Sequence, residues 1–393
     1  MSISTKMKTF LERASWIRKM FEQGAELKER HGHDNVFDFS LGNPNLEPPI
    51  LFKTALLKAT QAKGIGHHAY MPNSGYMSVR EAVAGFVSSE QGIKLAPDHV
   101  IMTCGAAGAL NVILKTILNS GDEVITPAPY FPEYNFYVDN HGGVLKTVPT
   151  KPDFSLDLDS IEEAITQKTR AILINSPHNP TGQVYDEKEL IELGELLNNR
   201  IRKGDQIIYL ISDEPYRKIV YDNVRVPSIL SCYSESLIAT SYSKDLSIPG
   251  ERIGFLVVNP EARHREDLLA GMNLANRILG FVNAPALMQR TIQDLQGVSV
   301  DVKFYQEKRD MISEGLERIG YRFERPKGAF YLFVQSPIDD DVRFVQALQE
   351  ELILTVPGSG FGCAGYFRIA FCVDDDTIVR ALPGFERAFE RVR

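Results

Sequence analysis

The sequence has little cysteine and no long apolar run. Its four cysteines are Cys104, Cys232, Cys363 and Cys372. They lie far apart without metal-ligand spacing, which favours the reduced thiols of a cytoplasmic protein. The longest apolar stretches, such as 171–174 and 207–211, have the length of a strand and are far too short to span a membrane. Residues 1–10 lack the apolar core and cleavage site of a signal peptide. We therefore expect a cytoplasmic protein with no membrane or metal partner.

An excess of positive charge is also lacking. The 393 residues include 43 basic and 51 acidic side chains, which gives a formal net charge of −8, and no basic run occurs. A nucleic-acid partner is therefore not expected. The composition, with 44% hydrophobic and 24% charged residues, is that of an ordinary globular protein. The length predicts two or three units with buried cores.

What the middle of the chain does contain is an alternation of apolar strands and helices. Apolar strands separated by helices predict a mostly parallel sheet that is covered on both faces. Ligands of such sheets bind at the carboxyl ends of the strands. The predicted strands are 100–103, 123–126, 143–148, 171–174, 206–212 and 236–240, and the predicted helices are 109–118, 158–167, 187–202 and 225–235.

The two ends of the chain have a different pattern. The first part predicts helices at 11–31, 50–63 and 77–90 and a short strand at 36–40. From about residue 285, long helices over 285–317, with a break near Gly297, precede the predicted strands 322–324, 329–335, 353–356 and 367–371 and a last helix 375–391. We predict a large α/β domain over 46–284 and a smaller α+β domain built from 1–45 and 285–393.

Several chemically distinctive segments follow predicted strands directly. The small residues Gly105–Gly108 follow the strand 100–103 and precede a helix, a geometry in which helix N-terminal amides bind phosphate. Tight packing explains such a turn equally well. Prolines and aromatic side chains form a stiff segment at 127–134. Polar residues follow two more strands at 175–182 and 213–216, where His178 between two prolines is expected to be structural.

A lysine stands in a loop of hydroxyl side chains after the strand 236–240. Lys244 follows Ser241 and Ser243, and Arg252 comes eight residues later behind Pro249-Gly250. An amine that attacks a carbonyl needs a lysine with a lowered pKa, and a phosphate needs an arginine with hydroxyl or backbone donors. The loop offers both groups, although by itself the segment also fits a solvated surface lysine.

These segments together resemble the class I/II aminotransferases, the fold type I enzymes that use pyridoxal 5′-phosphate. The resemblance extends from about Phe39 to Phe371, and no single motif is specific by itself. The motifs, in the order of the family, are Leu-Gly-Asn-Pro at 41–44, Tyr70 with Gly75 and Arg80, Asn-Pro-Thr-Gly at 179–182, Asp-Glu-Pro-Tyr at 213–216, Ser-Tyr-Ser-Lys at 241–244 with Gly-Glu-Arg at 250–252, Lys-Gly-Ala-Phe-Tyr at 327–331, Pro-Gly-Ser-Gly-Phe-Gly at 357–362 and Phe-Arg-Ile-Ala-Phe at 367–371.

The resemblance implies catalytic roles for three residues. Lys244 would attach the cofactor covalently and then move the proton between the substrate Cα and the cofactor. Asp213 would face the pyridine nitrogen and keep it protonated. Tyr216, together with Asn179, would donate hydrogen bonds to the 3′ oxygen of the ring. A helix cap is the alternative role for Asp213.

The resemblance also implies which residues bind the phosphate and the ring of the cofactor. The amides of Gly105, Ala106 and Ala107 would bind the phosphate, although this turn lacks the serine or threonine that many relatives carry. Further donors would be Ser241, Ser243 and Arg252, with Tyr70 reaching in from the other subunit of a homodimer whose active sites lie at the subunit interface. Phe131 would stack on the ring, with Tyr130 as the alternative.

The substrate residues implied by the resemblance centre on Arg368. Its guanidinium would bind the α-carboxylate, assisted by Asn179 and the Gly42 backbone, because an arginine inside an apolar strand needs an anion. A structural arginine is the alternative. For a distal carboxylate, Arg277 is one candidate that also fits a surface helix, and Lys327 and His67 are weaker ones.

The resemblance implies an aminotransferase that moves the amino group of an L-amino acid of the aspartate, alanine or aromatic class to a 2-oxo acid such as 2-oxoglutarate. A carbon–sulfur β-lyase on the same scaffold would share Lys244, Asp213 and Arg252, so it stays as the alternative. A ligand-sensing module of a transcription regulator is the non-enzymatic alternative. It is disfavoured because no basic helix-turn-helix precedes residue 35.

Overall fold

The structure, a computed structural model, describes the chain except residues 1, 14, 15, 65, 205 and 393. The described part contains a seven-stranded sheet in the order β2-β8-β7-β6-β5-β3-β4. Its strands are β2 Val100–Thr103, β3 Glu123–Ala128, β4 Val144–Pro149, β5 Thr169–Asn175, β6 Tyr209–Asp213, β7 Ser236–Ser241 and β8 Gly254–Val258. β8 runs antiparallel to β2 and β7, and every other pairing is parallel. The predicted mostly parallel sheet is confirmed.

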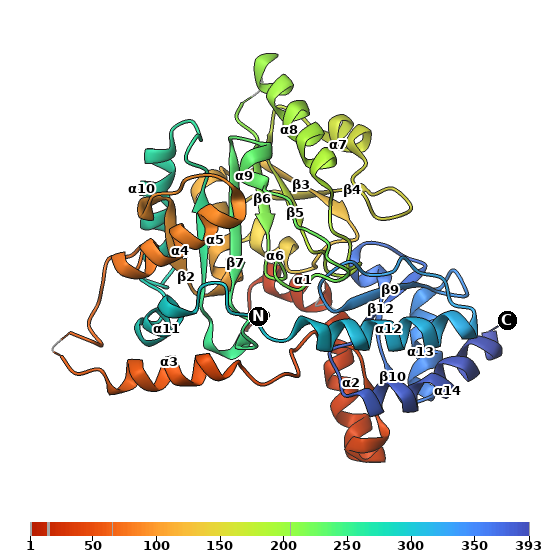
Figure 1. The fold of residues 1–393 in the computed structure, drawn as a ribbon. Coiled ribbons are helices and arrows are strands. Elements are labelled where there is room, and N and C mark those ends of the chain that lie inside the picture. The colour runs from red at the N-terminus through yellow and green to blue at the C-terminus, as the bar shows by residue number, and fades with distance from the viewer. Residues whose placement is uncertain (1, 14–15, 65, 205, 393) are drawn as a thin grey trace.

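Both faces of this sheet are buried because successive strand side chains point to opposite sides. On β5, Ile172 and Ile174 belong to one apolar cluster, whereas Ala171 and Leu173 belong to another. The first cluster is completed by α4 Met77–Gln91, α8 Glu187–Arg202, α9 Ile229–Cys232 and α11 Ala286–Ile292, with α7 Leu158–Ala164. The second is completed by α5 Gly105–Ile117, α6 Tyr134–Asp139 and α10 Arg265–Ile278. Helices therefore cover both faces (Figure 1).

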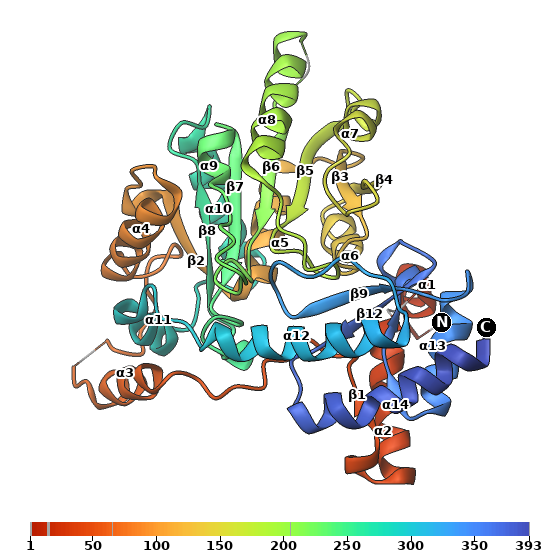
Figure 2. The ribbon, with the colours of Figure 1, turned by 45° about the vertical axis from the view of Figure 1, so that its right-hand side comes forward.

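Two small sheets lie beside the large one, where the two ends of the chain meet. β9 Tyr331–Gln335, β11 Val356–Pro357 and β12 Tyr366–Ala370 form an antiparallel sheet, and β1 Phe37–Asp38 pairs with β10 Ile353–Leu354 in parallel. The remaining helices are α1 Thr5–Arg13, α2 Trp16–His31, α3 Ile50–Gln61, α12 Val302–Ile319, α13 Asp341–Glu350 and α14 Asp375–Val392. Red N-terminal and blue C-terminal elements lie side by side (Figure 2).

A third apolar cluster forms the core of this smaller unit. It joins Phe39 to side chains of α12, β9, β12, α13 and α14. It also includes Phe154, Tyr216, Ile219 and Tyr221, which lie within 46–284, the range predicted for the large domain. The boundaries 46–284 and 1–45 with 285–393 stay a prediction.

Several predicted elements differ from the structure. Residues 105–108 are the first turn of α5 and not a separate turn. The strand expected at 322–324 is only an isolated bridge between Phe323 and Val334. The helix expected at 225–235 is one short turn, and β8 and α10 were not predicted. By contrast, the helices expected over 285–317 with a break near Gly297 are confirmed, because α11 and the 3-10 turn Gln293–Leu295 precede Gly297 and α12 follows it. Residues 14 and 15 of the predicted helix 11–31 lie outside the described residues.

Two further expectations concern the chain as a whole. No helix among the described residues is both long and apolar enough to cross a membrane. All four cysteines are free thiols.

Candidate active site

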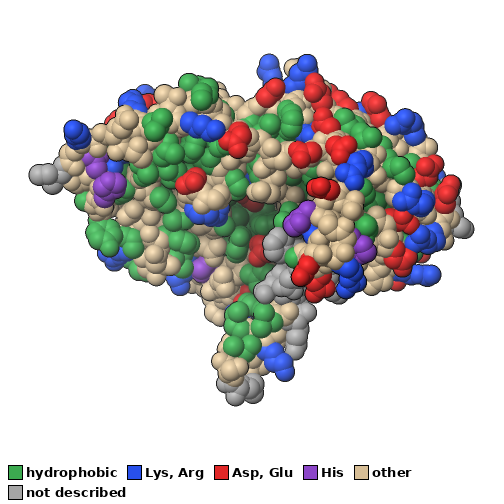
Figure 3. All heavy atoms as spheres, turned by 90° about the horizontal axis from the view of Figure 1, so that it is seen from below, with side chains coloured by type: hydrophobic (Ala, Val, Ile, Leu, Met, Phe, Trp, Pro, Cys, Tyr) green, Lys and Arg blue, Asp and Glu red, His purple; other side chains and the backbone are tan. Residues whose placement is uncertain are grey.

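A cavity of about 320 Å³ lies at the carboxyl ends of β5, β6 and β7, beside the N-terminus of α5. Viewed from below, the molecule is hollowed between its two halves (Figure 3). The cavity collects most of the residues that the sequence predicts: Gly42, Ala106, Ala107, Phe131, Asn179, Asp213, Tyr216, Ser241, Ser243, Lys244, Arg252 and Arg368. Parallel strands place their carboxyl ends on one edge, which explains why segments distant in the sequence meet here.

Lys244 presents its amine inside this cavity. Its Nζ donates to the Gly42 carbonyl at 2.8 Å and lies 5.4 Å from the centre of the Phe330 ring and 5.8 Å from that of Tyr216. Burial lowers the pKa of Lys244 to about 8, and the positive charges of Arg368 and Arg252 act in the same direction. The lowered pKa makes a larger fraction of the amine neutral near physiological pH than an ordinary lysine would have, as a nucleophile and proton acceptor requires.

We expect this lowered pKa to be measurable in the cofactor-free protein. The rate at which an amine reagent labels Lys244 should rise with a midpoint near pH 8, as the pKa of about 8 implies. The folded state releases this proton at lower pH than the unfolded chain does, so the group's contribution to stability increases as the pH rises from 8 towards the ordinary lysine value of 10.5. Peptide mapping by mass spectrometry checks the site, and labelling of Lys188, an exposed lysine that pairs with Glu192, is the control for the reagent. Labelling of Lys244 that does not change around pH 8 would contradict the expectation.

Asp213 ends β6 and reaches the cavity with one unsatisfied oxygen. Its Oδ2 accepts a hydrogen bond of 2.6 Å from the Tyr134 hydroxyl, while Oδ1 is buried and has no partner among the described residues. Burial raises the pKa of Asp213 to about 7; the Tyr134 hydrogen bond opposes this shift, and the charge of Glu214 adds to it. A buried acceptor without a donor is costly, so Oδ1 is suited to an N–H group that enters with a ligand.

Arg368 is a buried cation with only neutral partners. Its Nη1 donates to Asn179 Oδ1 at 3.0 Å and its Nη2 to the Ser40 carbonyl at 2.5 Å, while Nε has no partner within the described chain. The guanidinium lies 4.6 Å from the Tyr331 ring centre and 4.8 Å from that of Phe361. Burial lowers the pKa of Arg368. A buried guanidinium of this kind favours a carboxylate ligand.

The opposite end of the cavity is built for an anion. α5 has 13 residues and begins at Gly105, and its first turn lines the same cavity as Ser241, Ser243 and Arg252. The first amides of a helix have no partner within the helix and favour an anion. Gly105 has a φ of +73°, and a Cβ there would lie 3.0 Å from Nη2 of Arg252. Arg252 itself has a φ of +51° and donates to the Pro249 carbonyl at 2.9 Å. The positive φ therefore favours glycine at position 105, and a side chain there would crowd the guanidinium beside the helix N-terminus.

β8, which the sequence did not predict, holds this end together. It places Gly254 opposite Ser241 of β7. A Cβ on Gly254 would lie 2.4 Å from the Thr240 carbonyl and 2.8 Å from Cα of Gly105. The close approach of β8 to both strand and helix therefore requires glycine at this position.

Some site residues were missed by the sequence analysis. Asn175 accepts from the Asn179 amide at 2.7 Å and donates to the Asp213 carbonyl at 2.7 Å, so it orients both loops. Tyr331 exchanges a hydrogen bond of 2.8 Å with Tyr216. Tyr134 and Tyr137 come from α6. The available signal was the end of β5 for Asn175, the Lys-Gly-Ala-Phe-Tyr motif for Tyr331 and the aromatic segment 127–134 for Tyr134, whereas Tyr137 lies beyond that segment.

Other predicted residues lie elsewhere. Gly105 does not line the cavity, although it adjoins it, and Tyr70 is 89% exposed and also lies outside it. Arg277 and Lys327 are exposed and His67 is half-buried, and none of them lines the cavity.

Two alternatives from the sequence are also decided. Phe131 lines the active-site cavity, whereas Tyr130 does not. His178 is buried against Thr181 and does not line the cavity, and burial lowers its pKa to about 3.

The sheet order and the cavity with its lysine, aspartate and arginines define a fold type I aminotransferase. Residues 34–384 match the family of aminotransferase class I and II. The chain belongs to this family and is an aminotransferase. The family implies pyridoxal 5′-phosphate as the cofactor. The site fits that molecule, because Asp213 Oδ1 has no donor among the residues that the structure describes and the α5 N-terminus with Arg252 suits a phosphate.

Relatives support this assignment over nearly the whole chain. A probable aspartate aminotransferase of Methanocaldococcus jannaschii is 30% identical over 91% of this chain and 94% of its own length. The aromatic-amino-acid aminotransferase 2 of Thermococcus litoralis is 31% identical over 96% of both chains. A crystal structure of an aminotransferase from Eubacterium rectale is 39% identical and superposes with a TM-score of 0.96 over 100% of this chain and 99% of that one.

Proposed function

We propose that this enzyme binds pyridoxal 5′-phosphate through Lys244 and transfers the amino group of an L-amino acid to a 2-oxo acid. The observation that carries the proposal is the combination, in one cavity, of a buried amine with a lowered pKa and the unpaired Oδ1 of Asp213. The Arg252 end of the cavity supplies the anion site. The cofactor supplies the electron sink that stabilises a carbanion at the substrate Cα.

The protein residues in this proposal hold and move protons. Asp213 accepts a hydrogen bond from the ring nitrogen of the cofactor and favours its protonated form. Lys244 removes the proton from the substrate Cα and later returns one, which its pKa of about 8 permits near neutral pH. Tyr216 and Asn179 orient the ring, and the amides of Gly105, Ala106 and Ala107 bind the phosphate together with Ser241 and Ser243, at the α5 N-terminus. Phe131 packs on the ring.

The substrate carboxylate is assigned to Arg368. Its partners Asn179 and Ser40 are both neutral, so the bound carboxylate would supply the missing negative charge. The Gly42 backbone lies beside Lys244, which limits the substrate to a small space at Cα. The names of the relatives favour donors of the aspartate and aromatic classes. We propose 2-oxoglutarate as the acceptor.

A homodimer is part of the proposal. Tyr70 is 89% exposed, and the helix α3 before it exposes Ile50 at 74% and Leu57 at 60%. We infer that a second copy of the chain covers these exposed apolar side chains. The partner's copy of Tyr70 would complete the phosphate site. We place the enzyme in the cytoplasm, in line with its widely spaced free cysteines.

The test is a spectrum of the purified enzyme loaded with cofactor, recorded with a panel of L-amino acids and no 2-oxo acid. True donors should shift the visible absorption band of the bound cofactor to shorter wavelength within one turnover and release the matching 2-oxo acid, because the first half-reaction needs no acceptor. Addition of 2-oxoglutarate should restore the band.

Two outcomes would contradict the proposal. Continuous release of pyruvate and ammonia from a cysteine conjugate, without an acceptor, would instead identify a carbon–sulfur β-lyase. A protein that acquires no visible band when pyridoxal phosphate is added would show that Lys244 does not bind it. D-Amino acids serve as the negative control.

A further inference from the structure

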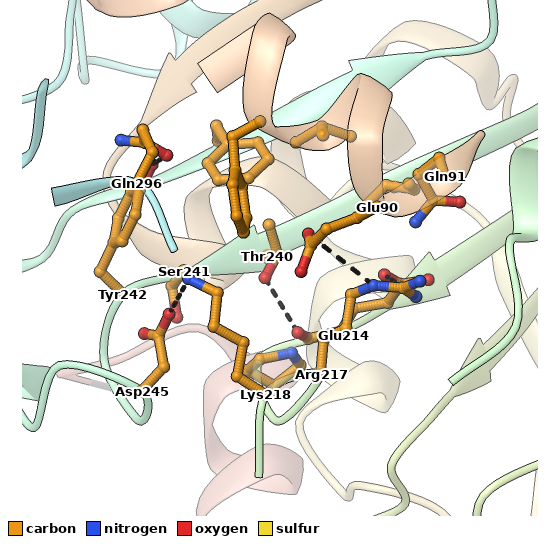
Figure 4. Close-up of a pocket in the computed structure, with 15 residues that line it drawn as sticks. Glu90, Gln91, Glu214, Arg217, Lys218, Thr240, Ser241, Tyr242, Asp245 and Gln296 are labelled. Atoms are coloured by element: carbon orange, nitrogen blue, oxygen red, sulfur yellow. Dashed lines mark hydrogen bonds and ion pairs between the residues drawn. The ribbon is translucent and has the colours of Figure 1, made fainter. Parts of the chain in front are cut away.

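The carboxyl ends of β6 and β7, with the segments that follow them, present side chains on two sides. Toward the active-site cavity they place Asp213, Tyr216 and Lys244. Away from it, Lys218 and Asp245 line a second cavity of about 40 Å³. Figure 4 shows this second cavity, with the Lys218 and Asp245 side chains directed toward each other. Each of these three residues is thus one or two positions from a charged residue that lines the second cavity.

The central contact behind the site is the ion pair between Lys218 and Asp245. Lys218 Nζ lies 2.8 Å from Asp245 Oδ2, and the two side chains are 16% and 8% exposed. The ammonium also lies 4.8 Å from the centre of the Phe86 ring. The backbone carbonyl of Asp245 accepts from the Val300 amide at 2.7 Å. Asp245 is therefore fixed by side chain and backbone, directly beside Lys244.

A second set of contacts anchors the same segment to α4. Arg217 Nη1 lies 3.0 Å from Glu214 Oε2, and its Nε lies 3.9 Å from Glu90 Oε2. It also donates to the carbonyl oxygens of Val226 at 3.0 Å and Pro227 at 3.2 Å. The segment that carries Tyr216 is thus held to the helix behind it, and Lys218 then connects it to the Lys244 segment.

Stability alone does not explain this pair. Moving two charges from water into the protein costs about as much as their attraction returns, and an apolar pair of similar volume often packs at least as well. An ion pair with fixed geometry holds its two side chains at a defined distance from each other, which an apolar contact does not. A displacement of about 1 Å at a reacting group can lower a rate by about 10²-fold.

We propose that the Lys218–Asp245 ion pair is a positioning device that fixes Lys244 relative to Asp213 and Tyr216. This inference rests on the proposed function, since it is the cofactor that these three residues would hold. Neither member of the pair lines the active-site cavity, so both act through the main chain of their neighbours.

The test compares Asp245→Asn, Lys218→Met and the double variant with the parent enzyme. All three should bind pyridoxal phosphate at least about tenfold more weakly and lose up to about 10²-fold in kcat, with KM for the amino donor unchanged. The double variant should recover the folding stability that each single variant loses, because it leaves no unpaired buried charge. It should not recover kcat.

A second readout needs no cofactor. In cofactor-free Asp245→Asn, the labelling midpoint of Lys244 should move up, toward the ordinary lysine value, because a looser segment exposes the amine to water. Loss of the Asp245 charge by itself would move the midpoint down, since a nearby negative charge favours the protonated amine. The direction of the shift therefore distinguishes positioning from a charge effect.

Glu235→Gln is the matched control. Glu235 is a buried carboxylate that pairs with Arg263 and directly precedes β7, at the opposite end of the same strand. Its variant should lose stability but keep cofactor affinity and the Lys244 midpoint. The inference is wrong if the Asp245 and Lys218 variants behave like this control. If instead the parent enzyme binds no pyridoxal phosphate, the proposed function itself fails.

Discussion

Lys244→Ala is expected to abolish turnover and the visible band of the bound cofactor together. The substitution removes the attachment point and the group that moves the proton, and general acid–base catalysis alone contributes about 10²- to 10⁴-fold. The protein should still fold, because the change deletes an amine whose burial already disfavours its charge. Steady-state amino transfer, and intact mass after reduction with borohydride, measure the two effects.

The control for this substitution is Lys308→Ala. Lys308 is also a buried lysine, but it pairs with Asp375 on α14 and does not line the active-site cavity. Its variant should lose stability and keep the cofactor band and the mass increase after reduction. Retained transamination by Lys244→Ala would refute the assignment of this lysine.

Arg368→Met is expected to lower kcat/KM by roughly 30- to 5000-fold for both the amino donor and the 2-oxo acid. The range corresponds to the loss of about 2–5 kcal/mol when one partner of a buried, hydrogen-bonded charge pair is removed. Both substrates carry the carboxylate that Arg368 would bind, so both should be affected. The dissociation constant for pyridoxal phosphate should stay unchanged.

Two variants decide whether this effect is specific. Arg368→Lys keeps the charge but loses the planar fork, so it should restore only part of the activity. Arg309→Met removes an arginine of equal burial whose partners are the carboxylates of Asp222 and Asp310. It should reduce stability without changing kcat/KM. An equal loss of activity in Arg309→Met and Arg368→Met would favour a structural role for Arg368.

Much of the site could be predicted from sequence because it follows strand ends. A parallel sheet brings the carboxyl ends of its strands to one edge, so Asp213 and Lys244 could be placed together without a structure. β8 was missed because it follows the Lys244 loop directly and runs antiparallel, which a pattern of alternating strands and helices does not predict. Asn175 and Tyr331 were missed as site residues because their roles depend on hydrogen bonds to distant partners.

The sequence by itself determined the class of fold, the family resemblance and the residue types at the site. These features depend on local patterns, namely the period of apolar residues and the polar residues after each strand. The tertiary structure alone decided the burial that brings the pKa of Lys244 to about 8, the unpaired Oδ1 of Asp213, and the contact of Lys218 with Asp245. Burial and pairing depend on which distant segments pack together, and that is a property of the folded chain.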